Sequence, residues 1–328
     1  MNNIVENKRF SFLAELSNTR SAIMGVAILW IMLFHSGIEA PENIVLRALW
    51  YLFVSFGGGV GVNLFFILSG FGLYYSVSKY SAADKVDWWT WFKKRLTRLL
   101  PSYLIVSVAY YLMKGDLSLY NILQLNFWID GVRDFWFIPG ILACYILFPA
   151  IYTAAKKRGY GKTTIALLII LVVGNILFEA VSSHFSKIEI FTWRIPCFVA
   201  GVYLGYLSKV QPQYNKLLVY GTLLATLVLC FVFTGMSRAF FLVGTVCFLP
   251  VLTGLLRVLI KLAPPAQAII EYLGTRSLQI YLLHVSVVPL VLNMVWQFNL
   301  ILYFVVTFII GELLYQLTSL IKVNSKKQ

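Results

Sequence analysis

The sequence predicts an all-α integral membrane protein with about ten transmembrane helices. Of its 328 residues, 60% are hydrophobic and only 12% are charged, whereas an ordinary soluble domain has roughly 25% charged residues. Apolar runs of about 18 residues or more, long enough to cross a bilayer, recur along the whole chain. Aromatic residues make up 16% of the chain, which is typical of a protein with interfacial belts on both sides of a membrane.

The apolar runs, and the helix-breaking residues between them, define the predicted spans. The segment 45–56 is also apolar, but it leads into Gly57-Gly58-Gly59, so we expect a re-entrant or interfacial piece there. We expect a cytoplasmic N-terminal segment over 1–20, one polytopic membrane domain over 21–321 and a cytoplasmic tail over 322–328, without a signal peptide or a soluble domain. The ten spans are 21–37, 57–78, 99–113, 135–154, 164–181, 192–208, 216–234, 239–260, 276–296 and 298–321.

The basic residues predict the orientation of these spans. If the N-terminus is cytoplasmic, 21 of the 27 basic residues fall in inner segments. Such a bias predicts an even number of spans with both termini inside. It also explains the net charge of +14 by a cytoplasmic membrane face, so we expect a lipid bilayer as partner and no nucleic acid. The basic residues that remain outside are Arg47, Lys114, Arg133, Lys187, Arg194 and Arg238.

The four cysteines predict neither disulfides nor a metal site. Cys144, Cys197, Cys230 and Cys247 all lie in apolar stretches, with no CxxC pair and no nearby histidine pattern. We therefore expect buried free thiols and no bound metal.

His35 ends the apolar stretch Ile23-Met-Gly-Val-Ala-Ile-Leu-Trp-Ile-Met-Leu-Phe-His35, and it is one of three histidines in the chain. An imidazole at membrane depth is a candidate catalytic residue, unless it is a boundary histidine satisfied by water or a carbonyl. In the predicted topology His35 lies near the outer face and Arg20 lies at the inner end of the same helix. The fifteen residues between them rise about 22 Å. On position alone, an ordinary positive charge at the inner boundary is the favoured interpretation of Arg20.

The second predicted span contains Gly59-Val-Gly-Val-Asn-Leu-Phe-Phe-Ile-Leu-Ser-Gly-Phe71. Its glycines let another helix or a ligand approach the backbone closely. Asn63 and Ser69 place an amide and a hydroxyl at membrane depth. The block therefore indicates either close helix packing or the lining of a cavity.

A strongly basic inner segment follows, Phe92-Lys-Lys-Arg-Leu-Thr-Arg-Leu-Leu-Pro-Ser-Tyr103. Arg95 and Arg98 are three residues apart and would face one side of a helix, where they can bind phosphate together with Lys94. The positive-inside bias explains the same charges without a ligand.

Further candidates lie elsewhere in the predicted spans. His284, Glu312 and Arg194 are ionisable residues at membrane depth. Glu179 and His184 are five residues apart, which is not the spacing of helix neighbours, so we interpret them as interface residues. Gly159-Tyr-Gly-Lys-Thr-Thr164 is not a phosphate-binding loop, because Lys156 occupies the position of its first glycine and no strand precedes it.

Taken together, six segments in order resemble the membrane-bound acyltransferase family 3. They are Leu-Phe-His35; Gly-Val-Asn-Leu-Phe-Phe-Ile-Leu-Ser-Gly at 61–70; the basic segment with Arg95, Arg98 and Pro101; Trp136-Phe-Ile with Pro149; the span containing Gly201; and Leu273-Gly-Thr-Arg-Ser-Leu-Gln-Ile-Tyr-Leu-Leu-His284. They run along nearly the whole chain. The family often has arginine eleven residues before the histidine, where this chain has Met24. We expect Arg20, one helical turn further in, to take over that role.

The resemblance implies an O-acyltransferase of a bacterial cytoplasmic (inner) membrane. Members carry an acyl group, usually acetyl, from coenzyme A to a hydroxyl of a cell-surface polysaccharide, an exopolysaccharide or another glycan. His35 would then be the essential histidine, and Arg95 and Arg98 would lie near the phosphates of acetyl-CoA. Asn63, Ser69 or an arginine would stabilise the oxyanion. The alternative is a transporter or flippase of a lipid-linked sugar.

Overall fold

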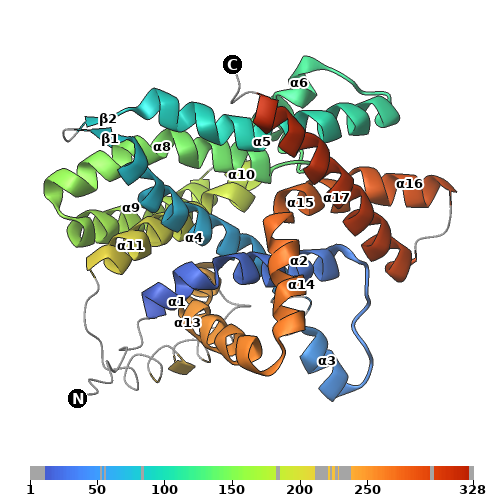
Figure 1. Ribbon diagram of the computed structural model, residues 1–328, viewed down its shortest axis with the longest axis horizontal. Coiled ribbons are helices and arrows are strands. Elements are labelled where there is room, and N and C mark those ends of the chain that lie inside the picture. The colour runs from blue at the N-terminus through green and yellow to red at the C-terminus, as the bar shows by residue number, and fades with distance from the viewer. Residues whose placement is uncertain are drawn as a thin grey trace, which may run out of the picture.

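The computed structural model is almost entirely helical, as the apolar runs predict (Figure 1). In the part of the chain that it describes, the strands are β1 (Ser81–Ala82) and β2 (Lys85–Val86), which pair antiparallel. The all-α class is therefore confirmed. The structure describes residues 12–51, 54, 57–82, 85–181, 185–210, 221, 224–225, 228, 238–295 and 299–324.

The first half of the chain supplies the helices on which most of the candidate residues lie. They are α1 (Phe12–Asn18), α2 (Arg20–His35), α3 (Ile44–Trp50), α4 (Gly57–Val77), the short 3-10 helix η2 (Ser78–Tyr80), α5 (Trp88–Lys114), α6 (Leu119–Ile122), α7 (Leu125–Asp130) and α8 (Phe137–Arg158).

The second half adds long helices around these and a bent region that returns to α2. Its helices are α9 (Tyr160–Val181), α10 (Phe185–Thr192), α11 (Ile195–Val210), α13 (Arg238–Leu262), α14 (Pro264–Thr275), α15 (Ser277–His284), α16 (Val287–Val295) and α17 (Leu300–Asn324).

The number of spans differs from the predicted ten. Within the described residues, seven helices are long and apolar enough to cross a membrane, or up to eight if one bent pair counts as a span. The predicted first span is the shorter helix α2, and most of the span predicted at 216–234 lies outside the described residues. The orientation with both termini inside remains a prediction.

The bent pair is the main departure from the predicted pattern. Pro264–Thr275 and the helical stretch Ser277–Asn293 meet at an angle of 67°. Arg276 lies at the break, and its backbone leaves the helical region with φ −105° and ψ 5°. The predicted span 276–296 is therefore one arm of a bend, and this arm carries His284.

Helix α2 lies between α4 and α14, and glycines allow the close contact (Figure 1). A Cβ atom on Gly25 would lie 1.9 Å from the Ile270 carbonyl oxygen, and one on Gly274 would lie 1.8 Å from that of Ser21. Since no side chain fits at either position, the backbones of α2 and α14 touch. The packing interpretation of the glycine block is confirmed at Gly70, where a Cβ atom would lie 2.2 Å from the Phe198 carbonyl oxygen.

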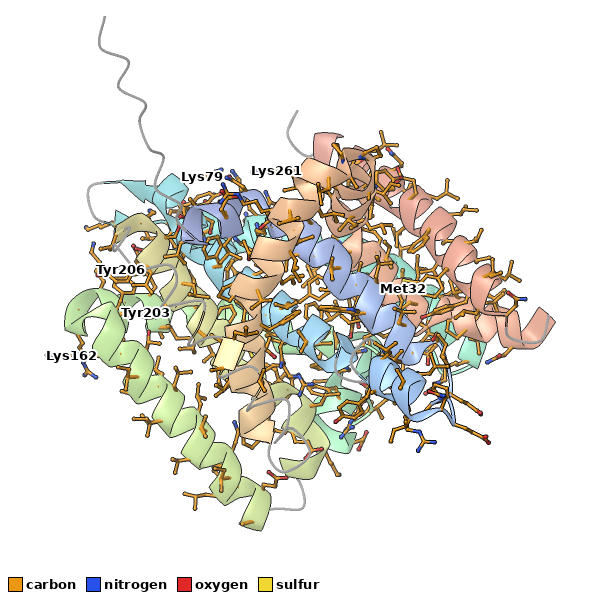
Figure 2. All side chains as sticks on the ribbon, turned by 90° about the horizontal axis from the view of Figure 1, so that it is seen from below. Met32, Lys79, Lys162, Tyr203, Tyr206 and Lys261 are labelled. Carbon is orange, nitrogen blue, oxygen red and sulfur yellow. The ribbon has the colours of Figure 1, made fainter. Side chains whose placement is uncertain are left out.

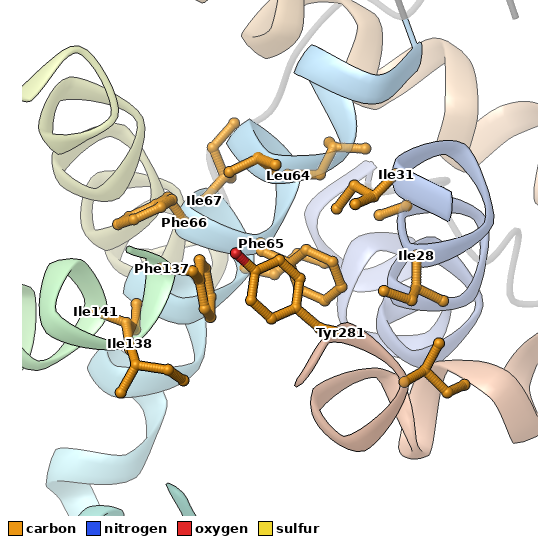
Figure 3. Close-up of a cluster of buried hydrophobic side chains, with 14 of the residues drawn as sticks. Ile28, Ile31, Leu64, Phe65, Phe66, Ile67, Phe137, Ile138, Ile141 and Tyr281 are labelled. Atoms are coloured by element: carbon orange, nitrogen blue, oxygen red, sulfur yellow. The ribbon is translucent and has the colours of Figure 1, made fainter. Parts of the chain in front are cut away.

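Apolar side chains of α2, α4, α8 and α15 fill the space between these helices (Figure 3). The Tyr281 ring lies among them, 4.9 Å from the ring of Phe137 between centroids. Figure 2 shows Lys79 and Lys261 near one edge of the molecule, with Met32, in the last turn of α2, lying away from that edge. The start of α2 packs on Gly72, near the end of α4, and its last turn packs on Gly58, at the start of α4, so the two helices run antiparallel.

Candidate functional site

A cavity of about 210 Å³ lies between α2, α4, α5, α8 and α15. Its polar lining comes from elements that are far apart in sequence. Apolar and aromatic side chains, Phe65, Phe137 and Tyr281 among them, close the rest of its wall. The polar residues are Arg20, Ser69, Ser76, Arg95, Arg98, Tyr145 and Ser277.

The three arginines predicted for the inner end meet in this cavity. Arg20 comes from the start of α2, and Arg95 and Arg98 come from consecutive turns of α5. Within the described part of the chain, none of them forms an ion pair. Grouped positive charges without a counter-charge are costly to hold inside a protein. The cavity therefore suits an anion.

The protein fixes the Arg20 and Arg95 side chains without neutralising them. The Arg20 guanidinium packs on the bare backbone of Gly72, where a Cβ atom would lie 2.7 Å from Nη2. The Arg20 Nε atom is buried and has no hydrogen-bond partner among the described residues. Arg95 donates from Nη1 to the Trp91 carbonyl oxygen at 3.0 Å, and its Cζ lies 4.5 Å from the centroid of the Trp91 ring. These contacts hold both cations while leaving charge available to a ligand.

Lys94, predicted with the two α5 arginines, does not line the cavity. It is exposed, and its Nζ lies 5.2 Å from the centroid of the Tyr80 ring. Because neighbouring residues on a helix point about 100° apart, Lys94 faces the rim and not the interior.

His35 is held at the far end of α2 from Arg20. Its Nδ1 lies 2.9 Å from the Ile31 carbonyl oxygen. A carbonyl oxygen only accepts a hydrogen bond, so Nδ1 carries the hydrogen and Nε2 of the neutral ring keeps its lone pair. The side chain is exposed. Nε2 can therefore act as a base toward a molecule outside the helix bundle.

A second histidine, His284, lies beside His35 in the structure. The centroids of the His35 and His284 rings are 5.2 Å apart, and the rings meet at 74°. His284 is buried, and its Nδ1 lies 2.7 Å from the Tyr281 carbonyl oxygen. Its Nε2 is buried and has no hydrogen-bond partner in the described residues. Both histidines are candidates from the sequence alone, but their contact is not predicted, because it depends on the bend at Arg276.

Tyr281 connects the cavity to the two histidines, and sequence reasoning missed it. Its ring lines the cavity and lies 5.2 Å from the His284 ring between centroids. Its sequence signals were its place in the family-like segment 273–284 and its position three residues before His284, almost one helical turn away.

The other predicted residues divide between the cavity and the packing around it. Ser69 lines the cavity, whereas Asn63 does not, and Asn63 Nδ2 donates to Thr245 Oγ1 at 2.9 Å. Trp136 stacks on Phe66, and the Arg194 guanidinium lies 5.7 Å from the Trp136 ring centroid.

Glu312 belongs to an ion pair outside the cavity. Arg276 Nε lies 2.5 Å from Glu312 Oε2, and the Tyr272 hydroxyl donates to the same oxygen at 2.6 Å. These contacts tie the bend between α14 and α15 to α17.

The thiol prediction is confirmed for Cys144, Cys197 and Cys247, which are buried and free. Cys230 and His184 lie outside the described residues. Among the residues that the structure describes, no group of three or more His, Cys, Asp or Glu side chains is arranged to hold a metal ion.

Comparison with known proteins gives one match. The family model described as an acyltransferase domain, of acyltransferase family 3, matches residues 22–315. The matched range includes every residue of the cavity except Arg20. No curated protein and no solved structure shows a significant match to the chain.

Proposed function

The chain belongs to acyltransferase family 3 and is a membrane acyltransferase, and from this premise we propose that it is an O-acyltransferase of cell-surface glycans. In this proposal it takes an acyl group, most often acetyl, from acyl-CoA on the cytoplasmic side of a bacterial inner membrane. The acceptor is a hydroxyl of a polysaccharide or a related glycan on the outer side.

The observation that carries the proposal is the group of three arginines without acidic partners. Arg20, Arg95 and Arg98 line one cavity, and none has an ion pair among the described residues. Coenzyme A ends in a nucleotide whose phosphates carry several negative charges. Guanidinium groups bind phosphate oxygens through paired, charge-assisted hydrogen bonds. The cavity arginines would hold this end of the donor.

The acyl end of the donor would then lie toward the histidine pair. The Arg20 and His35 positions are about 22 Å apart along α2, and the long flexible arm of coenzyme A spans such a gap. Tyr281 lines the cavity and contacts His284. The route of the arm from the arginines to His35 therefore runs past Tyr281.

His35 would act as the general base. Its Nε2 takes the proton from the acceptor hydroxyl while the hydroxyl oxygen attacks the thioester carbonyl carbon. The carbon–sulfur bond then breaks, and the coenzyme leaves as a thiolate that receives the proton from the imidazolium. A transient acyl-histidine is the variant in which Nε2 itself attacks first.

Neither of the two predicted oxyanion donors has a hydrogen bond to His35 among the described residues. Ser69 lines the cavity near Gly72, on which Arg20 packs at the far end of α2, and the Asn63 amide donates to Thr245. An oxyanion donor must lie beside the thioester carbonyl on which His35 would act, so this role of Ser69 or Asn63 stays a prediction. We propose the segment 114–134, on the outer side in the predicted topology, as the acceptor surface; in it the Tyr120 hydroxyl donates to Asp130 at 2.7 Å.

The test is the variant His35→Ala in native membranes, assayed with labelled acetyl-CoA and the glycan of the same cells. We expect transfer to fall by roughly 10²–10⁴-fold, the usual contribution of a general base. The control is Arg47→Ala, because within the described residues this exposed arginine bonds only the carbonyls of Pro41 and Glu42. Undiminished transfer by inserted His35→Ala protein would contradict the proposal. Glycan that crosses the membrane without modification would favour the flippase instead.

A further inference from the structure

Two cations lie against one tyrosine ring at the rim of the cavity. Lys94 Nζ is 5.2 Å and Arg95 Cζ is 5.4 Å from the centroid of the Tyr80 ring. We call these three residues the Tyr80 cluster. Arg95 also lines the cavity, whereas Lys94 and Tyr80 do not. The Tyr80 cluster is thus continuous with the cavity but extends beyond it.

The chain fixes Tyr80 in this place. Tyr80 ends the short helix η2, and the β1–β2 hairpin then reverses the chain so that α5 runs back beside it. The Asp87 backbone N–H donates to the Tyr80 carbonyl oxygen at 3.0 Å. Asp87 also caps α5 by accepting a hydrogen bond from the Thr90 N–H at 3.1 Å. These bonds hold the ring against the second turn of α5.

The positive charge of the cluster has no partner in the described residues. Neither Lys94 nor Arg95 forms an ion pair there, and the Asp87 carboxylate is engaged in its cap. Burial raises the pKa of Tyr80, but hydrogen bonds and charge from Arg95 and Lys94 outweigh it, so this pKa lies below its ordinary value. The phenol therefore lies in a positive electrostatic potential, which a bound anion would reduce.

We propose that the Tyr80 cluster is a second phosphate subsite, which binds the ribose 3′-phosphate of the coenzyme A donor. This inference rests on the proposed function and adds a specificity-determining site to it. Arg95 faces both the cavity and the Tyr80 cluster, so a ligand with phosphates at two places can engage both. An exposed lysine supplies the point charge that a terminal phosphate needs. The cavity arginines would then bind the diphosphate of the same coenzyme A molecule.

The experiment compares acetyl-CoA with acetyl-dephospho-CoA, which lacks only that phosphate. For the unmodified protein we expect a KM about tenfold lower for acetyl-CoA, the usual effect of one charge-assisted contact. In Lys94→Met the two KM values should become nearly equal. The matched control is Lys93→Met, because Lys93 Nζ lies 5.2 Å from the Trp89 ring and not against Tyr80. This control should keep the preference.

Direct binding separates this inference from the proposed function. Calorimetry in nanodiscs of neutral lipid measures the affinity for adenosine 3′,5′-bisphosphate and for adenosine 5′-phosphate, whether or not transfer is observed. Tighter binding of the bisphosphate, lost in Lys94→Met and kept in Lys93→Met, supports the subsite even if His35 proves dispensable.

Three results would overturn the subsite. One is equal use of the two donors by the unmodified protein. Another is an equal rise of both KM values in Lys94→Met. The third is a Lys94 effect that appears only in vesicles with anionic lipid, because the cluster would then bind lipid headgroups.

Discussion

The cavity arginines and Arg276 are the same residue type in opposite settings. Arg276 has a carboxylate at 2.5 Å and two tyrosine rings, Tyr272 and Tyr315, whose centroids lie 3.6 and 4.5 Å from its Cζ. Arg20 has no ion pair among the described residues and rests on a glycine. A partnered arginine stabilises the fold, whereas an arginine held in place without a counter-charge is available to a ligand.

The largest expected effect comes from removing two cavity arginines together. In Arg20→Met/Arg95→Met the KM for acetyl-CoA should rise by about 10²-fold or more, since two charge-assisted contacts to phosphate are lost. The midpoint of thermal denaturation in detergent should change little, because the removed charges have no acidic partner among the described residues. A large fall in that midpoint would show that these arginines stabilise the fold, as Arg276 does.

At the bend between α14 and α15 we expect the opposite result, a loss of stability with little change in the donor KM. Arg276→Met leaves the Glu312 carboxylate, a half-buried group, without its main partner, so the free energy of unfolding should fall by ~1–3 kcal/mol. Donor KM measured at low temperature should stay within about twofold, because Arg276 does not line the cavity. Glu312→Gln is the matched variant and should lower thermal stability in the same direction. A tenfold change of the donor KM in both variants would contradict the distinction between an arginine that stabilises the fold and an arginine that binds the donor.

The smallest expected effect tests how Arg20 is positioned. In Gly72→Ala the new Cβ would lie 2.7 Å from Arg20 Nη2, the flexible tip of a long side chain. We expect the guanidinium to shift and the donor KM to rise only a few fold, on the order of 1 kcal/mol, with unchanged thermal stability. Gly174→Ala in α9 is the control, since among the described residues nothing lies within 4 Å of a Cβ there. No change in KM for Gly72→Ala would mean that Arg20 does not need its present position.

The sequence was sufficient for the class of fold, and the arginines that it singled out line one cavity. Periodic spacing placed Arg95 and Arg98 on one face of a helix, and apolar length identified seven of the spans as single long helices. The predicted number of ten spans was not confirmed. Apolar length in the sequence does not distinguish a full span from the short helix α2 or from the bent pair that meets at Arg276. Arg20, which is expected to replace the family arginine absent at Met24, lines the same cavity as Arg95 and Arg98.

The histidine pair was beyond sequence reasoning for a physical reason. His35 and His284 are distant in the chain, and their contact depends on the 67° bend at Arg276 and on backbone contact between α2 and α14. Gly274 and Thr275 signal a helix boundary just before Arg276, but propensity does not predict the angle of the bend, and the histidine contact depends on that angle. Tyr281 was missed for the same reason, since its contact with the cavity depends on the same bend.

The glycine contacts of α2 fix the distance between the two ends of the candidate site. Because Gly25 and Gly274 lock α2 against α14, the helix cannot slide to adjust the separation between Arg20 and His35. The separation of Arg20 from His35 along α2 is therefore set by the number of residues between them. One residue inserted between its ends would turn the histidine by about 100° and move it by about 1.5 Å. This stretch should tolerate substitutions of its lipid-facing residues but no change in its length.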